Sequence, residues 1–352
     1  MLSRSEEVQD QEHTSASLWK GLVCPSCGCS LLPASVDTLA CPACSEEFPI
    51  VNGILRVRRK KASGLSGSSS DIARRDENLH LRTATSFGFE WMHFSEMYPE
   101  WENNFRDYMF PLTSASFSGK RVLDAGCGIG RHAYYAARYG AEVWAVDISD
   151  AVEVAAKNNQ GTGVRIVQAD LNHLPFREGS FDLVYSIGVL HHLPDPVVAF
   201  RYLLRFVKPG GEFRMFLYWA PEHQFLKGLL LKAVSVLRLV TTRMPHWLLY
   251  LLSYAAAFLV WGCFVLPHRA LTRVPIFSKI ADQIPLRQYS RYPFRTCVND
   301  QFDRFSAPLE RRYSRAQVEQ FLKSADLEEI NVFPNFGWVA SGRKPGSTKV
   351  AA

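Results

Sequence analysis

The stretch that decides the fold is Val122-Leu123-Asp124-Ala125-Gly126-Cys127-Gly128-Ile129-Gly130. An apolar run of strand type leads into three glycines at alternate positions, and a helical pattern follows. Glycine lets the backbone come close to a ligand, and the N-terminus of the next helix favours an anionic group. The spacing is DxGxGxG, whereas an ordinary dinucleotide-binding turn reads GxGxxG. The turn therefore predicts a site for a nucleotide-type ligand. Because the spacing departs from GxGxxG, a nicotinamide dinucleotide is the weaker alternative for that ligand.

The sequence on both sides of this turn predicts an α/β sheet. Short β-branched runs alternate with helical stretches over residues 119–219, as in βαβ units with parallel strands. A helical pattern resumes at Ser314, where Ser314 and Gln317 fit a capping box. Seven strands are expected near residues 121–124, 142–147, 164–169, 181–187, 212–219, 327–333 and 337–342.

Acidic residues end the second and third of these runs. Asp147 stands seventeen residues past Gly130, where its carboxylate can accept hydrogen bonds from both hydroxyls of a ribose. Asp170 ends the third run, and Lys208-Pro209-Gly210-Gly211 has the form of a turn before the fifth strand. Ligands bind at the carboxyl edge of an open parallel sheet, so both acids are expected beside the ligand.

In this order, the motifs of residues 121–219 resemble those of class I S-adenosylmethionine (SAM)-dependent methyltransferases. The nearest subfamily is the type 11 group, which includes quinone-, sugar- and natural-product-modifying enzymes. The resemblance implies a Rossmann-like sheet of seven strands that ends in an antiparallel hairpin. It also implies SAM as the cofactor, with Asp170 on the adenine amine. The residues expected to bind SAM are Asp124, Gly126, Cys127, Gly128, Gly130, Asp147, Ile148, Asp170, Leu171, Ser186 and Ile187.

Two histidines are the candidate catalytic residues. His191 and His192 follow the fourth strand, at the carboxyl edge of the sheet. A histidine there can deprotonate an acceptor hydroxyl near neutral pH. The alternative is that one packs on the cofactor and the other caps the next helix. The aromatic segment 86–91 is expected either to fold over the cofactor as a lid or to pack in the core.

Four cysteines predict a metal site near the N-terminus. Two CxxC pairs, separated by thirteen residues, offer four thiolates to a tetrahedral zinc ion: Cys24, Cys27, Cys41 and Cys44. Redox or free thiols are the alternatives, and Cys29 is a fifth thiol that could confuse the ligand set. Residues 22–57 resemble the small zinc-ribbon activator that partners tRNA, rRNA and protein methyltransferases. That resemblance implies a structural ribbon that stabilises or orients a methyltransferase.

The chain is expected to divide into two folded parts with an insertion. A Gly/Ser-rich tract at residues 62–70 is typical of a flexible linker. The expected segments are a disordered N-terminus (1–20), zinc ribbon (21–58), linker (59–75), first part of the methyltransferase core (76–220), apolar helical insertion after the fifth strand (221–312), last helix and two strands of the core (313–343) and disordered tail (344–352).

Composition and charge indicate the cellular location of the chain. The 352 residues include 40 Lys/Arg and 34 Asp/Glu, a net charge of +6, and residues 267–315 alone carry that excess. Acidic residues occupy the start of the chain, where a signal peptide needs a basic and then an apolar run. The expected location is therefore cytoplasmic, with reduced cysteines.

The insertion is strongly apolar. Residues 247–266 carry no charge and are long enough to span a membrane. However, the chain must return to complete the sheet, which a single crossing would prevent. Residues 222–268 are therefore expected to form a helical hairpin that lies on a membrane, lines an apolar substrate pocket, or does both. The alternative is a lid or dimer helix that the protein itself buries.

These observations favour an enzyme that methylates a small hydrophobic or lipid-linked acceptor, such as a quinone, natural product or lipid-carried sugar. An RNA methyltransferase is the second candidate, supported by the ribbon and by the basic cluster at residues 56–61. The third is a SAM-binding scaffold without activity, although a scaffold has no need of the intact glycine and acid set. The oligomeric state and the methyl-accepting atom do not follow from the sequence.

Overall fold

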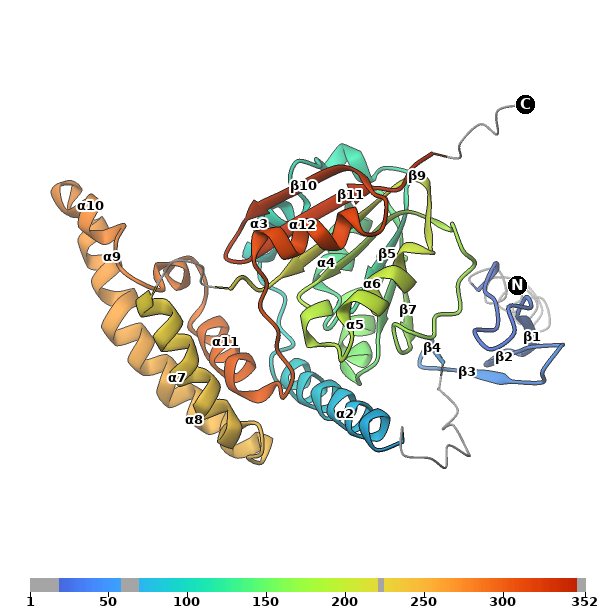
Figure 1. Ribbon diagram of the computed structural model, residues 1–352, viewed down its shortest axis with the longest axis horizontal. Coiled ribbons are helices and arrows are strands. Elements are labelled where there is room, and N and C mark those ends of the chain that lie inside the picture. Colours follow the sequence, from blue (N-terminus) through green and yellow to red (C-terminus); the bar gives the residue numbers. More distant parts are fainter. Residues whose placement is uncertain (1–18, 58–69, 221–224, 347–352) are drawn as a thin grey trace, which may run out of the picture.

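A computed structural model describes residues 19–57, 70–220 and 225–346. Its strands form one sheet with the order β1-β2-β3-β4-β7-β6-β5-β8-β9-β11-β10 (Figure 1). The strands are β1 (Leu32–Ser35), β2 (Thr38–Ala40), β3 (Glu47–Val51), β4 (Ile54–Arg56), β5 (Arg121–Ala125), β6 (Glu142–Asp147), β7 (Arg165–Gln168), β8 (Phe181–Ile187), β9 (Val207–Leu217), β10 (Glu328–Pro334) and β11 (Trp338–Arg343).

Strands β5 to β11 are the seven that the sequence predicts. Neighbours from β7 to β9 pair in parallel, and β11 pairs antiparallel with both β9 and β10. The fifth of them, β9, begins at Val207 rather than near residue 212. Val207 pairs with Phe181 and Glu212 with Leu183, so the Lys208–Gly211 turn lies inside the strand as an irregularity of register.

The sheet has eleven strands rather than seven because the cysteine ribbon joins it. The last ribbon strand, β4, pairs in parallel with β7, with Leu55 opposite Val167. Trp19 packs edge-on against Trp144 at a centroid distance of 6.0 Å, within a core that both parts share. The ribbon is therefore packed into the central sheet and shares a hydrophobic core with it.

Helices cover both faces of the sheet. They are α2 (Ser70–His93), α3 (Glu100–Met109), α4 (Arg131–Arg138), α5 (Ala151–Asn158), α6 (Pro196–Leu204) and α12 (Arg315–Lys323), with short η1 (Ser114–Phe117) and η2 (Leu190–His192). Helices α6 and α12 share one core with the ribbon, whereas α3, α4 and α5 build the core on the other face. Helix α2 begins within residues 59–75, which the sequence suggests as a linker.

Local chemistry explains where two of these helices, α6 and α12, start. The Asp195 carboxylate accepts hydrogen bonds from the amides of Val197 and Val198, both at 3.0 Å, and Pro196 occupies the first turn of α6. This is a favourable N-cap, because the first amides of a helix have no partners within it. The predicted capping box at Ser314 and Gln317 is present at the start of α12.

The insertion after β9 forms a helical unit at the end of the molecule opposite the ribbon (Figure 1). Its elements are α7 (Phe225–Thr241), α8 (His246–Val260), η3 (Trp261–Val265), α9 (Leu266–Thr272), η4 (Pro275–Phe277), α10 (Ser278–Ala281), η5 (Arg287–Arg291) and α11 (Phe294–Ser306). A third core, which includes Leu249, Val265 and Phe302, joins α8 and α11 to Phe94 after α2.

Candidate active site and cysteine cluster

A cavity of about 850 Å³ lies at the carboxyl edge of the sheet, between the glycine turn and α2. Of the predicted SAM-binding residues, seven line it: Gly126, Cys127, Gly128, Asp147, Ile148, Leu171 and Ile187. The other four, Asp124, Gly130, Asp170 and Ser186, do not. Helix α2 supplies a further wall through His80, Thr83, Ala84, Phe87 and Trp91. Two of these, Phe87 and Trp91, belong to the aromatic segment 86–91, whereas Phe89 of that segment packs against a hydrophobic core.

The glycine turn has a left-handed backbone at Gly126 and Gly128 and leaves no room there for a side chain. Gly126 has φ of +89°, and a Cβ there would meet the Val189 side chain at 2.3 Å. Gly128 has φ of +52°, and a Cβ there would lie 3.1 Å from the indole nitrogen of Trp91. Glycine is therefore required at both positions, because each combines a left-handed conformation with a close neighbour, which is Val189 for Gly126 and Trp91 of α2 for Gly128.

Asp147 ties the end of β6 to the glycine turn. Its Oδ2 accepts a hydrogen bond from the Gly128 amide at 2.9 Å. Its Oδ1 accepts from the Ser149 amide at 2.9 Å and from the Ser149 hydroxyl at 2.7 Å. The carboxylate is partly exposed at the cavity wall, so its remaining lone pairs are available to donors such as ribose hydroxyls.

Asp170 and Asp124 stand outside the lining residues. The Asp170 carboxylate accepts from the Asn172 backbone amide at 2.8 Å and lies 3.7 Å from Nε2 of His80, which does line the cavity. Burial raises the pKa of Asp124 to about 8, and a hydrogen bond from Tyr185 opposes that shift. The Asp124 carboxyl group is therefore mostly protonated at pH 7. It adds no negative charge to the cavity wall.

The two candidate histidines have different surroundings. His192 lines the cavity, packs edge-on against Phe87 at 4.8 Å, and places Nδ1 2.6 Å from the Leu309 carbonyl oxygen. His191 does not line the cavity. It is fully buried against the Tyr218 ring at 4.0 Å, and among the described residues neither of its ring nitrogens has a hydrogen-bond partner.

Burial also decides the charge state of both imidazoles. It is the main cause that lowers the pKa of His192, and it holds the pKa of His191 well below the usual range. Both rings are therefore neutral near pH 7. A carbonyl oxygen only accepts hydrogen bonds, so Nδ1 of His192 must carry its proton, which leaves an unprotonated Nε2.

A group of buried acids forms where α2 meets α11, and no sequence motif indicates it. Burial raises the pKa of Glu90 on α2 well above its ordinary value, and the nearby Asp303 and Asp300 raise it further. Burial also raises the pKa of Asp300 on α11 to about 6. Arg131, which lines the cavity, opposes both shifts. These acids come together only because α11 of the insertion packs on α2.

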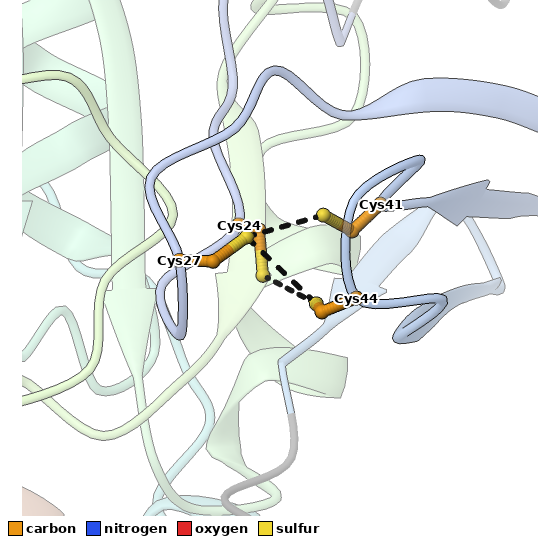
Figure 2. Close-up of side chains that lie close together, drawn as sticks. All are labelled: Cys24, Cys27, Cys41 and Cys44. Atoms are coloured by element: carbon orange, nitrogen blue, oxygen red, sulfur yellow. Dashed lines mark hydrogen bonds between the residues drawn. The ribbon is translucent and has the colours of Figure 1, made fainter.

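The four predicted cysteine ligands converge at the other end of the molecule. Figure 2 shows Cys24 and Cys27 on one loop and Cys41 and Cys44 on the next, with their sulfurs directed toward one another. The four sulfurs lie within 4.8 Å of one another, and the closest pairs are 3.3 to 3.8 Å apart. A tetrahedral shell with Zn–S bonds of about 2.3 Å needs sulfurs about 3.8 Å apart, so the arrangement fits zinc. Cys29 stays outside the cluster.

Comparisons with known proteins agree with this geometry. A family of methyltransferase domains matches residues 123–215. The chain is 34% identical over 149 residues to a ubiquinone biosynthesis O-methyltransferase of Ralstonia nicotianae, covering 41% of this chain and 61% of the relative. It is 37% identical over 101 residues to methyltransferase GfsG of Streptomyces halstedii, covering 27% of this chain and 36% of the relative. The chain thus spans less than two thirds of the length of these curated relatives.

One solved structure matches over most of the chain at low identity. It is a 1,6-didemethyltoxoflavin-N1-methyltransferase of Burkholderia thailandensis, with a TM-score of 0.43 and 15% identity, covering 86% of this chain and 97% of the other. The family match begins in β5 and ends in β9, and it includes the glycine turn and Asp147. Residues 123–215 therefore match a methyltransferase domain, and they include the glycine turn, Asp147 and the parallel strands from β5 to β9.

Proposed function

We propose that the chain transfers a methyl group from SAM to a hydroxyl of a small hydrophobic acceptor. The cavity supports an apolar acceptor, because carbon-rich side chains dominate its wall: Phe87, Trp91, Ile129, Ile187, Val189 and Leu193. The relatives point the same way, since one is named for ubiquinone biosynthesis and for O-methylation. A wall of this kind binds flat or aliphatic molecules and excludes water.

The arrangement of His192 carries the proposal of a hydroxyl acceptor. The ring lines the same cavity as the glycine turn, its Nδ1 donates to the Leu309 carbonyl, and its Nε2 is unprotonated near pH 7. A fixed tautomer beside the reaction site is what a general base requires. His191, buried against Tyr218, positions its neighbour and has no access to an acceptor.

Each residue then has a defined task. The glycine turn and Asp147 hold the cofactor, Phe87 and Trp91 orient the acceptor against it, and Nε2 of His192 takes the acceptor's hydroxyl proton. SAM, when bound at this turn, would supply an activated methyl group for the acceptor oxygen, and its neutral thioether S-adenosylhomocysteine would be the leaving group. The remaining contribution of the protein is proximity and orientation in a dry cavity.

We also propose that Cys24, Cys27, Cys41 and Cys44 bind one structural zinc ion. A closed shell of four thiolates leaves no open position for chemistry. The Ser26 hydroxyl donates to the buried Glu46 carboxylate at 2.7 Å, and Glu46 also lies 3.7 Å from the Cys24 sulfur. This support from outside the four ligands is typical of a site that keeps its shape.

The RNA alternative loses part of its basis. Of the basic residues in the cluster at 56–61, Arg56 is the one that belongs to the described residues. Arg56 is buried, pairs with Glu153, and donates to the side chain of Gln168 at 2.7 Å. A guanidinium that is used in this way fixes the ribbon to the sheet and is not free to contact phosphates.

The proposal is tested with the full chain, methyl-labelled SAM and an extract of the source cells, separated into organic-soluble, RNA, protein and polar fractions. We expect label in the organic-soluble fraction, and hydrolysis at high pH should leave it there because an ether is stable. Label in RNA would overturn the proposal in favour of the alternative. A chain that binds SAM but labels no fraction and forms no S-adenosylhomocysteine would be a scaffold.

A further inference from the structure

The outer helix of the insertion exposes a continuous apolar stripe. Residues His246–Thr272 run as one helix through α8, η3 and α9, and within the described residues it is the one helix long and apolar enough to span a membrane. One face is buried against the protein at Leu249, Ser253, Ala257 and Val265. The opposite face exposes six large side chains by 46% to 69%: Trp247, Leu251, Leu252, Phe258, Leu259 and Leu266.

Neighbouring elements enlarge this apolar surface. Helix α7, which precedes α8 and lies beside it in Figure 1, exposes Val236, Leu237, Leu239 and Val240. Beyond α9 the chain exposes Val274, Ile276, Phe277 and Ile280. A water-soluble monomer rarely exposes so many large apolar side chains together, and a surface of this kind marks an interaction site.

The charge around the stripe has one sign. Residues 225–295 contain ten Lys or Arg residues and one acidic residue, Asp282. Asp282 pairs with Arg287, and two more of these arginines pair with acids from outside the stretch, Arg238 with Glu310 and Arg295 with Glu96. Exposed basic residues lie on both sides of the stripe, with Lys232 and Arg243 before it and Arg273 and Lys279 after it.

A basic groove lies beside α7. It is a hollow of about 990 Å³, and four arginines and one acid are among its lining residues: Arg82, Arg238, Arg243, Arg312 and Glu310. Glu310 pairs with Arg238 and Arg312, so the groove keeps a surplus of positive charge. Exposed Leu239 also lines the groove, which places arginine and apolar side chains side by side.

We propose that this stripe docks on the surface of an anionic lipid bilayer, with helix His246–Thr272 lying in the interface. Apolar side chains would enter the acyl region while the flanking Lys and Arg residues contact phosphate headgroups, and the arginine groove would receive one of those headgroups. A helix that combines a wide apolar face with basic flanks binds membranes in this way. Helix crossing is excluded, because the inner face of the helix packs on α11.

A second copy of the chain fits this surface less well. In a symmetric dimer the same patch would face itself, so the basic flanks of the two copies would come together. Like charges at both ends of the stripe oppose that pairing in either relative direction of the helices. The membrane proposal does not depend on the reaction, since lipid binding needs no methyl transfer. Membrane docking would also bring the enzyme to an acceptor that is insoluble in water and resides in the bilayer.

Vesicle sedimentation of the full chain tests the proposal. One set of vesicles contains phosphatidylcholine alone, and the other contains phosphatidylcholine mixed with phosphatidylglycerol. We expect binding to the mixed vesicles that weakens with salt, and at least about tenfold weaker binding for the double substitution Phe258→Glu with Leu259→Glu. Val198→Glu is the control, because Val198 is an exposed apolar residue of α6, outside the insertion, and this variant should bind as the unsubstituted chain does.

Charge is tested separately. Arg273→Glu with Lys279→Glu should reduce binding to the phosphatidylglycerol vesicles. Unchanged melting temperature and SAM affinity would show that each variant folds. Equal sedimentation of the Phe258/Leu259 and Val198 variants would overturn the proposal. So would self-association of the chain, measured by light scattering, that the Phe258/Leu259 substitution abolishes while no vesicle binding is seen. Failure of vesicle binding would leave the methyl-transfer test unaffected, so the two proposals fail separately.

Discussion

At the scale of single residues, Asp147 is the side chain on which the cofactor proposal depends most. It accepts hydrogen bonds from the Gly128 amide and from Ser149, and its carboxylate faces the cavity. The same carboxylate therefore fixes the conformation of the glycine turn and provides the negative charge that the ribose hydroxyls would contact. Its place at the end of the second strand follows from the sequence alone. Its bonds to the turn do not, because they depend on how β6 and the turn meet.

Asp147→Asn should weaken SAM binding at least about tenfold, since a charge-assisted hydrogen bond contributes about 1.5–3 kcal/mol. The amide also places a donor where the carboxylate accepts from Gly128 or Ser149. Isothermal titration calorimetry with SAM measures the effect. Asp150→Asn is the control, because Asp150 is exposed and lies three residues further along the chain. Equal affinity in the Asp147 variant and the original chain would remove Asp147 from the cofactor site.

The histidine pair marks the limit of sequence analysis at this scale. His191 and His192 are adjacent, and the same chemistry is available to both. The structure separates them because η2 turns one ring toward Phe87 and the other toward Tyr218. The Leu309 carbonyl that selects the tautomer of His192 is 117 residues away. No local pattern could have indicated it.

At the scale of elements, the ribbon is the part whose role changes most between sequence and structure. The cysteine spacing predicts the four ligands, and all four converge. The spacing does not predict that β4 would extend the sheet at β7, because edge pairing depends on which strand is left free in three dimensions. Helix α2 shows the same limit. The sequence offers two positions for its aromatic segment 86–91, over the cofactor or in the core, and only tertiary packing decides that Phe87 and Trp91 line the cavity.

Cys41→Ser should remove the zinc ion and also lower the melting temperature of the whole chain. The reason is that Cys41 is buried in the core that the ribbon shares with Trp144 and Phe176. Zinc content by atomic absorption, combined with thermal unfolding, measures both effects. Cys29→Ser is the control and should keep one zinc per chain, since Cys29 lies outside the cluster. A Cys41 variant that retains its zinc would contradict the ligand set.

At the scale of the whole molecule, topology was the most predictable property. The order of motifs predicts the seven central strands and the final hairpin, because each motif is local and the βαβ rule fixes how neighbours connect. The requirement that the sheet close also excludes a single membrane crossing. The position and the role of the insertion could not be predicted from the order of motifs. Its helices pack on α2 and place Glu90 beside Asp300 and Asp303, but no described residue of 222–268 lines the cavity.

The central claim is that His192 acts as the base in a SAM-binding cavity, and His192→Asn tests it most directly. The asparagine amide keeps a donor for the Leu309 carbonyl but removes the basic Nε2. The initial rate of label transfer to the organic-soluble acceptor is measured for both proteins, and SAM affinity is measured by titration.

The rate should fall about 10²- to 10⁴-fold while SAM affinity stays the same. Burial lowers the pKa of His192, so the acid limb of the original protein's rate profile should lie below the pKa of an ordinary histidine. A variant that transfers label as fast as the original chain, at the same SAM affinity, would contradict the account.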